Sequence, residues 1–276
     1  MSNVPTKIAV VGAAGRMGRM IIEQIAADPE AQLSAAVEAS GSPALGEDAG
    51  ILAGVGELGV SVTDNMEDAV RKADAMIDFS APEGTLPNAR AAVAADCGVV
   101  IGTTGFSDAD REAIRALPKH GGKVVLAPNM SVGVNILFDL CARLAPVLCA
   151  DFDMEVVEMH HNQKKDSPSG TAKRIGEILA EGAGLDYAAD VRHGREGMVG
   201  ARPRKEIGMH ALRGGDVVGE HTVIFAGDGE RIELTHKASS RTTFAKGAVR
   251  AAKFLAVAEP DLYDMLDVLG IREQEK

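Results

Sequence analysis

A run of potentially reactive side chains lies in the middle of the chain. Residues 160–168 read His-His-Asn-Gln-Lys-Lys-Asp-Ser-Pro, and Ser169, Gly170 and Thr171 follow directly. Histidine titrates near neutral pH and can donate a proton to a reacting group, and lysine can stabilise developing negative charge. The first turn of a helix offers free backbone N–H groups to an anion. The stretch therefore suggests a site that holds a small anion beside its proton donors.

The flanking residues predict the elements that must position this run. Residues 153–159 alternate as a β-strand does, and residues 171–181 place apolar side chains at helical spacing. The reactive run would then form a strand–loop–helix junction. The plain alternative is a solvated basic loop followed by a helix cap. Two histidines and two lysines at a helix start, in a chain of formal net charge -11, favour the anion site.

Composition limits the classes of partner. A chain of 276 residues suits one large or two medium domains. Its acidic balance argues against nucleic acid, which binds basic surfaces. No apolar run approaches the ~20 residues of a membrane span, and the first residues lack a signal-peptide core. Three cysteines, Cys97, Cys141 and Cys149, are scattered without metal-ligand spacing, so we expect buried thiols in a reducing cytoplasm and no metal site.

The N-terminal residues predict a dinucleotide-binding unit. Lys7–Val11 reads as a buried strand, a glycine turn follows it, and residues 19–27 read as a helix. The next strand, residues 33–37, ends at Glu38, which lies twenty positions after Gly18. In such units the glycines let the backbone approach the phosphates, and an acid at this position binds a ribose hydroxyl. The glycine spacing is Gly-x-x-Gly-x-x-Gly, so a plain strand–helix turn is the alternative; the acid in register favours the nucleotide.

The pattern of alternating strands and helices continues through the first half of the chain. Residues 39–60 interrupt it as a long loop or helical insertion. Further strands are predicted at 75–80, 98–102 and 123–126, and helices at 65–72, 82–95 and 108–117. The expected fold is α/β, with a doubly wound, Rossmann-like parallel sheet. Small polar loops then gather at the carboxyl ends of the strands, where such sheets bind ligands.

The second half predicts a different sheet. A helix is expected at 132–148, before the strand that leads to His160. Three strands at 207–212, 217–225 and 230–238 read as an antiparallel meander, with hairpin turns at residues 214–216 and 227–229. Two helices, at 244–258 and 261–269, are expected to end the chain.

These motifs together resemble the dihydrodipicolinate reductase (4-hydroxy-tetrahydrodipicolinate reductase) family of bacterial and plant lysine and diaminopimelate biosynthesis. The resemblance spans nearly the whole chain, and its most specific part is the run His-His-x-x-Lys-x-Asp-x-Pro-Ser-Gly-Thr-Ala. The motifs that carry it are Val10–Gly18, Asp78-Phe-Ser80, Gly102-Thr-Thr-Gly105, Ala127–Gly133, Glu158-Met-His-His161, Lys164, Asp166, Pro168–Ala172 and Ser239-Ser-Arg241.

The resemblance implies a function and a set of site residues. It implies hydride transfer from NADH and/or NADPH to a small cyclic dicarboxylate, with His160 and Lys164 as catalytic residues. Asp166 is expected to orient Lys164 or to cap the turn, and Arg241 either to contact a carboxylate or to form a surface ion pair. The implied substrate contacts are His161, Ser169, Gly170 and Thr171. The implied cofactor contacts are Gly12, Ala13, Ala14, Gly15, Arg16, Met17, Glu38, Gly102, Thr103, Thr104, Ala127, Pro128, Asn129 and Met130.

The resemblance also implies a domain organisation. Residues 1–130 and 240–276 would form the nucleotide domain, and residues 131–239 an α/β substrate domain with a mainly antiparallel or mixed sheet, through which a homotetramer forms. Two positions depart from the family's pattern. Met130 stands where many members carry Phe. Ala39 follows Glu38 where some members carry an Arg that holds a 2′-phosphate, so a strict NADPH preference is not expected.

Three other functions are compatible with parts of the sequence. Another two-domain dehydrogenase of a small acidic amino-acid or semialdehyde substrate would use the same nucleotide unit but gives the paired histidines no role. A redox-sensing regulator would need a basic DNA-reading helix, which the sequence does not suggest. A metal-dependent hydrolase built on His160 and His161 is disfavoured, because adjacent residues on a strand point to opposite faces.

Overall fold

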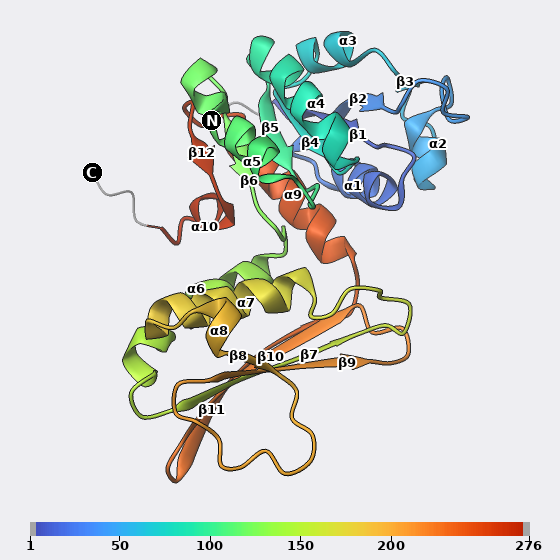
Figure 1. Ribbon diagram of the computed structural model, residues 1–276. Coiled ribbons are helices and arrows are strands. Elements are labelled where there is room, and N and C mark those ends of the chain that lie inside the picture. The colour runs from blue at the N-terminus through green and yellow to red at the C-terminus, as the bar shows by residue number, and fades with distance from the viewer. Residues whose placement is uncertain (1–3, 273–276) are drawn as a thin grey trace. The chain divides into compact units, whose positions relative to one another are not determined.

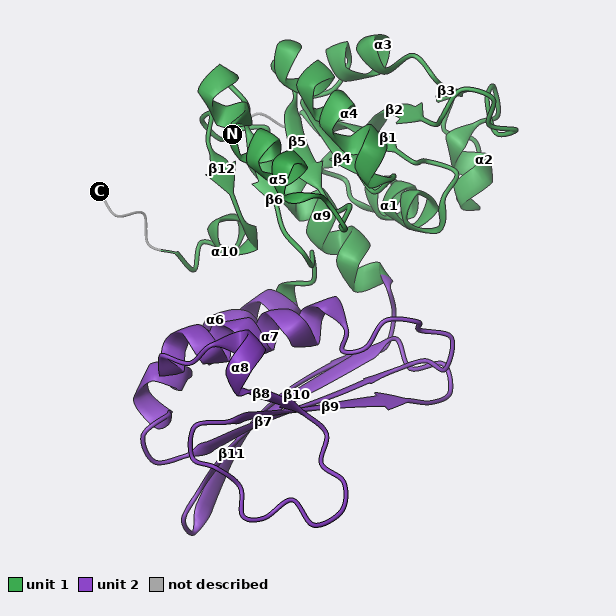
Figure 2. Ribbon diagram, viewed as in Figure 1, with its two compact units in different colours: residues 1–132, 242–276 green, residues 133–241 purple. Residues whose placement is uncertain are grey.

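The computed structural model describes residues 4–272, which form two compact units (Figures 1 and 2). The first unit contains the residues up to Val132 and those from Thr242 onward, and the second contains Gly133–Arg241. Residues 1–3 and 273–276, at the two ends of the expected nucleotide domain, lie outside the described residues. Within residues 4–272, no helix is both long and apolar enough to cross a membrane.

The first unit is built on a parallel sheet of seven strands, in the order β12-β6-β5-β4-β1-β2-β3. Its strands are β1 (Thr6–Val11), β2 (Ala31–Val37), β3 (Val62–Thr63), β4 (Ala75–Asp78), β5 (Gly98–Ile101), β6 (Val124–Leu126) and β12 (Leu262–Tyr263). Its helices are α1 (Arg16–Ala27), α2 (Ala49–Ala53), α3 (Met66–Arg71), α4 (Pro82–Ala94), α5 (Asp108–Arg115), the 3₁₀ helix η1 (Leu117–His120), α9 (Thr242–Leu255) and α10 (Met265–Val268). The predicted doubly wound α/β fold is confirmed.

Both faces of this sheet are covered by helices. On β1, Ile8 and Val10 belong to one hydrophobic core with α1 and α9, whereas Ala9 and Val11 belong to a second core with α3, α4 and α5. A parallel strand that is buried on both faces needs apolar residues at consecutive positions. This explains why these strands appear in the sequence as short, uninterrupted apolar runs.

The end of the first unit differs from the prediction. A single helix was expected over residues 261–269, but Leu262–Tyr263 forms strand β12, which pairs in parallel with β6. The backbone N–H of Val124 also donates to the carbonyl of Asp261. The helix begins only after Asp264, whose side chain caps it in a capping box. Completing the hydrogen bonds of the sheet edge therefore takes priority over helix formation at these residues.

The second unit is a five-stranded mixed sheet, in the order β11-β10-β7-β9-β8. Its strands are β7 (Asp153–His160), β8 (Val191–His193), β9 (Ile207–Arg213), β10 (Gly219–Gly227) and β11 (Glu230–Ala238). Its helices are α6 (Val132–Leu148), α7 (Gly170–Ala183) and α8 (Tyr187–Asp190). In Figure 1, α6 and α7 lie along one face of the sheet, and a third core fills the space between them.

The expected meander of three strands is wrong. Strands β10 and β11 do form a hairpin, but β9 does not pair with β10: β7 lies between them and pairs in parallel with β9 and antiparallel with β10. The expected hairpin turn at residues 214–216 instead crosses the end of β7. There the N–H of Gly214 donates to the carbonyl of His160, and the carbonyl of Gly215 accepts from Asn162. The strand that leads to the reactive run is thus central in its sheet.

The turn between β1 and α1 depends on Gly18. A Cβ atom at this position would lie 2.1 Å from the carbonyl oxygen of Gly12 and 2.7 Å from the Cα atom of Ala13. Both neighbours are backbone atoms, so the helix itself would have to move. We predict that Gly18→Ala lowers the free energy of unfolding by about 1–3 kcal/mol, as overpacked sites do, measured by urea denaturation.

Gly84→Ala in α4 is the matched control. A Cβ atom there meets nothing closer than 3.7 Å, so the substitution should stabilise the helix slightly. A Gly18→Ala protein as stable as the wild type would contradict the close approach of α1 to the glycine turn.

Candidate active site

The strand–loop–helix junction predicted from the sequence is confirmed. Alternate residues of β7 point into the core, which puts Glu158 and His160 on the buried face. Helix α7 begins after Ser169, whose side chain accepts the backbone N–H of Ala172 as an N-cap. Gly170 is exposed, and a Cβ atom built on it would meet nothing within 4 Å, so the first turn of α7 has room around it.

Glu158 is the centre of the hydrogen bonds around this junction. Its carboxylate is fully buried, at 0% exposure, and accepts four hydrogen bonds. Oε2 lies 2.6 Å from His160 Nδ1 and 2.9 Å from one nitrogen of Arg213. Oε1 accepts the second nitrogen of Arg213 at 2.9 Å and the Ser169 N–H at 3.0 Å. Burial would raise the pKa of Glu158, but these contacts from His160, Arg213 and Ser169 lower it to about 2.

His221 on β10 packs against His160. The two rings meet edge to face, with centroids 5.2 Å apart, and His221 Nε2 lies 3.2 Å from the hydroxyl of Ser169. Burial, with the adjacent His160, lowers the pKa of His221 to about 3, so its ring is neutral at physiological pH. His160 is 9% exposed, and His221 is 3% exposed. His160 is thus the outer member of the pair, and His221 links it to the cap of α7.

Three further titratable residues of the run, His161, Lys164 and Asp166, have identified partners. Lys164 Nζ lies 2.9 Å from the Asp166 carboxylate, as expected for an aspartate that orients the lysine. Arg241 contacts His161, with 3.4 Å between a guanidinium nitrogen and Nε2. Desolvation, together with the positive charge of Arg241, lowers the pKa of His161. The hydroxyl oxygen of Ser169 accepts the Ala172 N–H and also contacts His221 Nε2. Ser169 therefore fixes the backbone turn before α7, and its hydroxyl is already hydrogen-bonded.

In the first unit, the glycine turn has the geometry of a phosphate-binding loop. Gly12 has φ +73°, a conformation that favours glycine. Helix α1 starts after Gly15, and no side chain among residues 4–272 caps it, which leaves its N-terminal N–H groups facing outward. Glu38 accepts the Ala14 N–H at 2.8 Å, so the acid at the end of β2 is tied to the glycine turn. Ala13 is buried, Met17 is half-buried and Arg16 is exposed.

The other predicted cofactor residues follow β5 and β6 at the same edge of the sheet. Gly102 packs against the Phe79 ring so closely that a Cβ atom would lie 2.1 Å from it. The Thr103 hydroxyl donates to the buried carboxylate of Asp78 at 3.2 Å, whereas Thr104 is exposed. After β6, Ala127 is buried, Pro128 exposed and Asn129 half-buried. The Met130 side chain is 2% exposed and belongs to the hydrophobic core of this unit.

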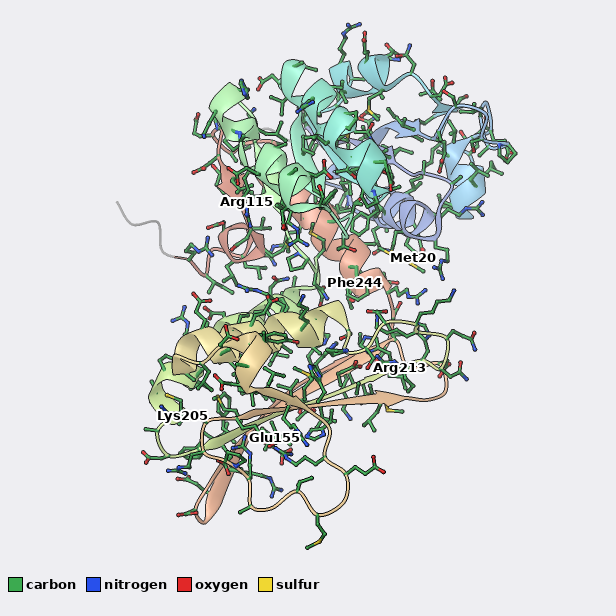
Figure 3. All side chains as sticks on the ribbon, in the orientation of Figure 1. Met20, Arg115, Glu155, Lys205, Arg213 and Phe244 are labelled. Atoms are coloured by element: carbon green, nitrogen blue, oxygen red, sulfur yellow. The ribbon has the colours of Figure 1, made fainter. Side chains whose placement is uncertain are left out.

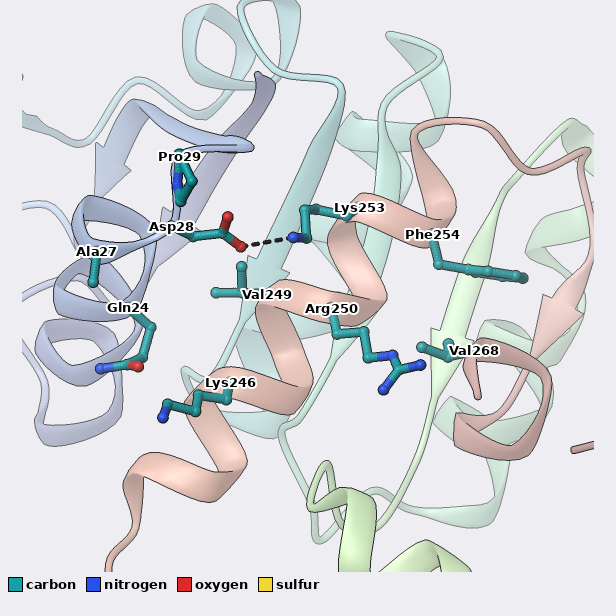
Figure 4. A pocket seen from close by; sticks show the side chains of 10 residues that line it. All are labelled: Gln24, Ala27, Asp28, Pro29, Lys246, Val249, Arg250, Lys253, Phe254 and Val268. Carbon is teal, nitrogen blue, oxygen red and sulfur yellow. Dashed lines mark hydrogen bonds and ion pairs between the residues drawn. The ribbon is translucent and has the colours of Figure 1, made fainter. Parts of the chain in front are cut away.

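A cavity of about 820 Å³ lies elsewhere on the first unit (Figure 4). It is formed by the end of α1, by α9 and by α10, and Lys253 on its wall pairs with Asp28 at 2.7 Å. Asp28 precedes β2, so the cavity is at the amino end of that strand, and Glu38 is at the carboxyl end. It is therefore distinct from the candidate cofactor site. Among residues 4–272, no group of three or more His, Cys, Asp or Glu side chains could hold a metal ion.

Family models match both units of the chain. The model described as dihydrodipicolinate reductase, N-terminus, matches residues 6–130, and that described as dihydrodipicolinate reductase, C-terminus, matches residues 133–269. The chain belongs to the dihydrodipicolinate reductase family. A 4-hydroxy-tetrahydrodipicolinate reductase of Syntrophotalea carbinolica is 52% identical over 266 residues, which cover 96% of this chain and 99% of the relative. That of Hahella chejuensis is 50% identical over 267 residues, covering 97% and 100%.

Solved structures support the fold. The dipicolinate-bound dihydrodipicolinate reductase from Paenisporosarcina sp. TG-14 matches with a TM-score of 0.76 at 23% identity, covering 96% of this chain and 99% of that one. An amine dehydrogenase from Mycobacterium smegmatis matches with a TM-score of 0.57 at 13% identity, covering 94% of both chains. The two-unit architecture is therefore shared with other dehydrogenases.

Three residues that surround His160 have no predicted site role in the sequence. Glu158 was recognised as part of a motif, and strand alternation could have placed it on the same face as His160. Arg213 and His221 come from strands that are distant in sequence, and their proximity depends on the order and register of the sheet. No local pattern marked either residue.

The buried groups predict a loss of stability in acid. The pKa of His221 is about 3 in the folded chain against an ordinary 6.5, and that of Glu158 about 2 against 4.5. Below each ordinary value the unfolded chain binds a proton that the folded chain excludes, so stability falls as pH decreases. We expect the urea midpoint to be highest near neutral pH and to fall steadily from about pH 6 to about pH 4.

Glu158→Gln separates the contribution of Glu158 from that of His221. The variant should be less stable than the wild type at neutral pH, and its midpoint should change less below about pH 5, because the titrating carboxylate is gone. A wild-type midpoint that stays constant down to about pH 4 would show that these groups do not resist protonation.

Proposed function

We propose that this chain reduces 4-hydroxy-tetrahydrodipicolinate (dihydrodipicolinate) to tetrahydrodipicolinate with NAD(P)H, a step of lysine and diaminopimelate biosynthesis. Membership of the family supports the reaction. The observation that carries it is the junction of β7 and α7, where His160 and Lys164 lie within a few residues of an open helix start. Such a site suits a small dicarboxylate that must receive a proton during reduction.

The first unit, which corresponds to the predicted nucleotide domain, would bind the cofactor. A bound nicotinamide cofactor supplies the hydride. The glycine turn fits its pyrophosphate, because Gly12 allows the tight turn and the start of α1 offers uncapped N–H groups. Glu38 would accept hydrogen bonds from the adenosine ribose. The remaining proposed contacts are Gly102, Thr103, Thr104, Ala127, Pro128, Asn129 and Met130. Because Met130 is buried, its side chain would support the loop from within the core.

The second unit, which corresponds to the predicted substrate domain, would bind and protonate the substrate. Negative charge builds on the substrate as hydride arrives, and His160 would donate a proton to it. Lys164, oriented by Asp166, would stabilise charge on the ring nitrogen or a carboxylate and share in proton donation. The N–H groups at Gly170 and Thr171 would hold a carboxylate, with Ser169 shaping the turn and His161 contributing a further contact.

We further propose that the enzyme is a cytoplasmic homotetramer assembled through the sheets of the second unit. The side chains on the sheet face that points away from the core include Leu212, 50% exposed, and the half-buried Val157 and Ile224. Light scattering coupled to size-exclusion chromatography would reveal the assembly, and a monomer would contradict this part of the proposal.

The reaction itself gives the first test of function. We expect the purified protein to oxidise NAD(P)H only when the substrate is present, and pyridine-2,6-dicarboxylate to compete with the substrate. His160→Ala should lower kcat by on the order of 10²–10⁴, the effect of losing a general acid, and leave NADH binding unchanged. His120→Ala, at an exposed position on the 3₁₀ helix η1, is the control and should retain full activity. Near-normal turnover by His160→Ala would remove His160 from the mechanism.

The choice of cofactor gives a second test. Glu38 would repel a 2′-phosphate, Ala39 supplies no cation, and Ser40 binds a further carboxylate, that of Asp64, at 3.0 Å. We therefore predict that NADH is used at least as well as NADPH. Ala39→Arg should shift the kcat/KM ratio toward NADPH roughly tenfold, the effect of one charge-assisted hydrogen bond of ~1.5 kcal/mol.

Gln32→Arg is the matched control for the cofactor test, because it adds the same charge at the other end of β2 and should leave the ratio unchanged. A wild-type preference for NADPH above about tenfold, some 1.4 kcal/mol, would mean that another cation, such as Arg16, holds the phosphate.

A further inference from the structure

The hydrogen bonds of Glu158 determine its protonation state. Each carboxylate oxygen accepts two hydrogen bonds, one from Arg213 and one from either His160 or the backbone of Ser169. A protonated carboxylic acid would have to donate one hydrogen, and only Nδ1 of His160 could accept it, because Arg213 and the Ser169 N–H can only donate. The guanidinium of Arg213, bound to both oxygens, favours the ionised form, and with the other contacts it lowers the pKa of Glu158 to about 2. Glu158 is therefore an ionised carboxylate whose acceptor positions are filled.

The ionised carboxylate in turn determines which nitrogen of His160 carries a proton. A carboxylate accepts but does not donate, so the 2.6 Å contact requires a hydrogen on Nδ1 of His160. Nδ1 is then protonated in both the neutral and the cationic ring. Nε2 is left as the atom that gains and loses the proton.

The surroundings of Nε2 agree with this assignment. A Cβ atom at Gly219, on the neighbouring strand β10, would lie only 3.0 Å from Nε2. A side chain at position 219 would therefore crowd Nε2, and glycine avoids this contact. His221, two residues further along β10, is neutral and meets the His160 ring edge to face, so it places no competing charge beside His160.

Arg213 connects this arrangement to the second proposed catalytic residue. The guanidinium group that holds Glu158 also donates to the backbone carbonyl of Asp166 at 2.7 Å, and the Asp166 side chain holds Lys164 at 2.9 Å. Arg213, labelled in Figure 3, ends strand β9. In the register of the sheet it pairs with His160. One arginine thus contacts the supports of both His160 and Lys164.

We propose that Glu158, held by Arg213, is a positioning residue that fixes the Nδ1–H tautomer of His160 and so makes Nε2 the proton donor to the substrate. This inference rests on the proposed function for the role of His160, but its statement about the tautomer does not. A buried ion pair also contributes to folding, so a useful test must distinguish positioning from stability.

Glu155 provides the matched control. It lies on the same strand but on the opposite face, and it makes a similar set of contacts with Arg195, Arg202 and His210. Burial would raise the pKa of Glu155, but its hydrogen bonds with Arg195, Arg202 and His210 lower it to about 2, as in Glu158. Glu155→Gln therefore removes a comparable charge from β7 without touching His160.

The experiment compares Glu158→Gln, Glu155→Gln and the wild type by ¹⁵N NMR of the histidine rings and by steady-state kinetics. The His160 signals are assigned by their loss in His160→Ala, and spectra are taken in alkaline buffer, above the pH at which those signals stop changing. In the wild type and in Glu155→Gln, the proton should reside on Nδ1. In Glu158→Gln, the side-chain amide can place an N–H donor opposite Nδ1 of His160. Nδ1 must then accept a hydrogen bond, so His160 should populate the Nε2–H tautomer.

The kinetic result should follow the tautomer. We expect Glu158→Gln to lower kcat by on the order of 10²-fold or more, with KM changed less than about threefold, and Glu155→Gln to leave both close to the wild type. Wild-type His160 with its proton on Nε2, or an unchanged tautomer and kcat in Glu158→Gln, would overturn the proposal. Equal losses of kcat in both variants would overturn it too, because they would indicate general destabilisation.

Arg213→Lys keeps the test decisive if Glu158→Gln does not fold. A lysine preserves a cation beside Glu158 but cannot reach both its oxygens and the Asp166 carbonyl. The carboxylate should stay ionised, so the Nδ1–H tautomer should persist while kcat falls through the displaced Lys164. Loss of the Nδ1–H tautomer in this variant would contradict the claim that Glu158 itself keeps the hydrogen on Nδ1 of His160. If the wild type fails to reduce the substrate, the proposed function fails, whereas the tautomer result stands or falls by itself.

Discussion

The structure around the candidate active site depends on one buried carboxylate. Removing an ionised carboxylate from water costs several kcal/mol, and a fully buried one is stable only when its oxygens are satisfied by donors. Glu158 meets this requirement with a bidentate arginine, a histidine and a backbone N–H, which come from β9, from β7 itself and from the start of α7. Three separate elements are therefore fixed relative to one charge. The reactive residues lie on the segments that this charge holds together.

Strand β7 carries a second network on its other face, with a different task. There Glu155 binds Arg195 and Arg202, both from the segment between β8 and β9, and Arg202 also binds Asp153 and three backbone carbonyls. These contacts hold that connecting segment against the outer face of the sheet (Figure 3). The outer network therefore orders a connection, whereas the inner one orders a histidine. The same combination of glutamate, arginine and histidine thus occurs on both faces of β7, and the proposed mechanism gives a chemical role only to the inner one.

The sequence predicted most of what is encoded locally. Buried parallel strands such as β1 appear as apolar runs, and the glycine turn, Glu38 and the β7–α7 junction occupy contiguous or regularly spaced positions. The failures concern pairing between distant segments. The glycine turn after β9 predicts a hairpin, because residue types within the turn cannot show that β7 lies between β9 and β10. The proximity of Arg213 and His221 to His160 cannot be predicted for the same reason, because it depends on the pairing of distant strands. Leu262 and Tyr263 form a strand because the edge of β6 needs a partner, which no short-range pattern reveals.

The protonation of Glu158 is the most direct measure of this account. The ¹³C chemical shift of its side-chain carboxyl, followed by NMR as the pH is lowered, reports protonation of this group alone. The account predicts a carboxylate signal that persists well below the ordinary glutamate pKa of 4.5 and changes only as pH approaches about 2 or the second unit unfolds. A titration midpoint at or above 4.5 in the folded protein would show that the carboxylate is not held ionised by its four donors, and would contradict the central role given to Glu158.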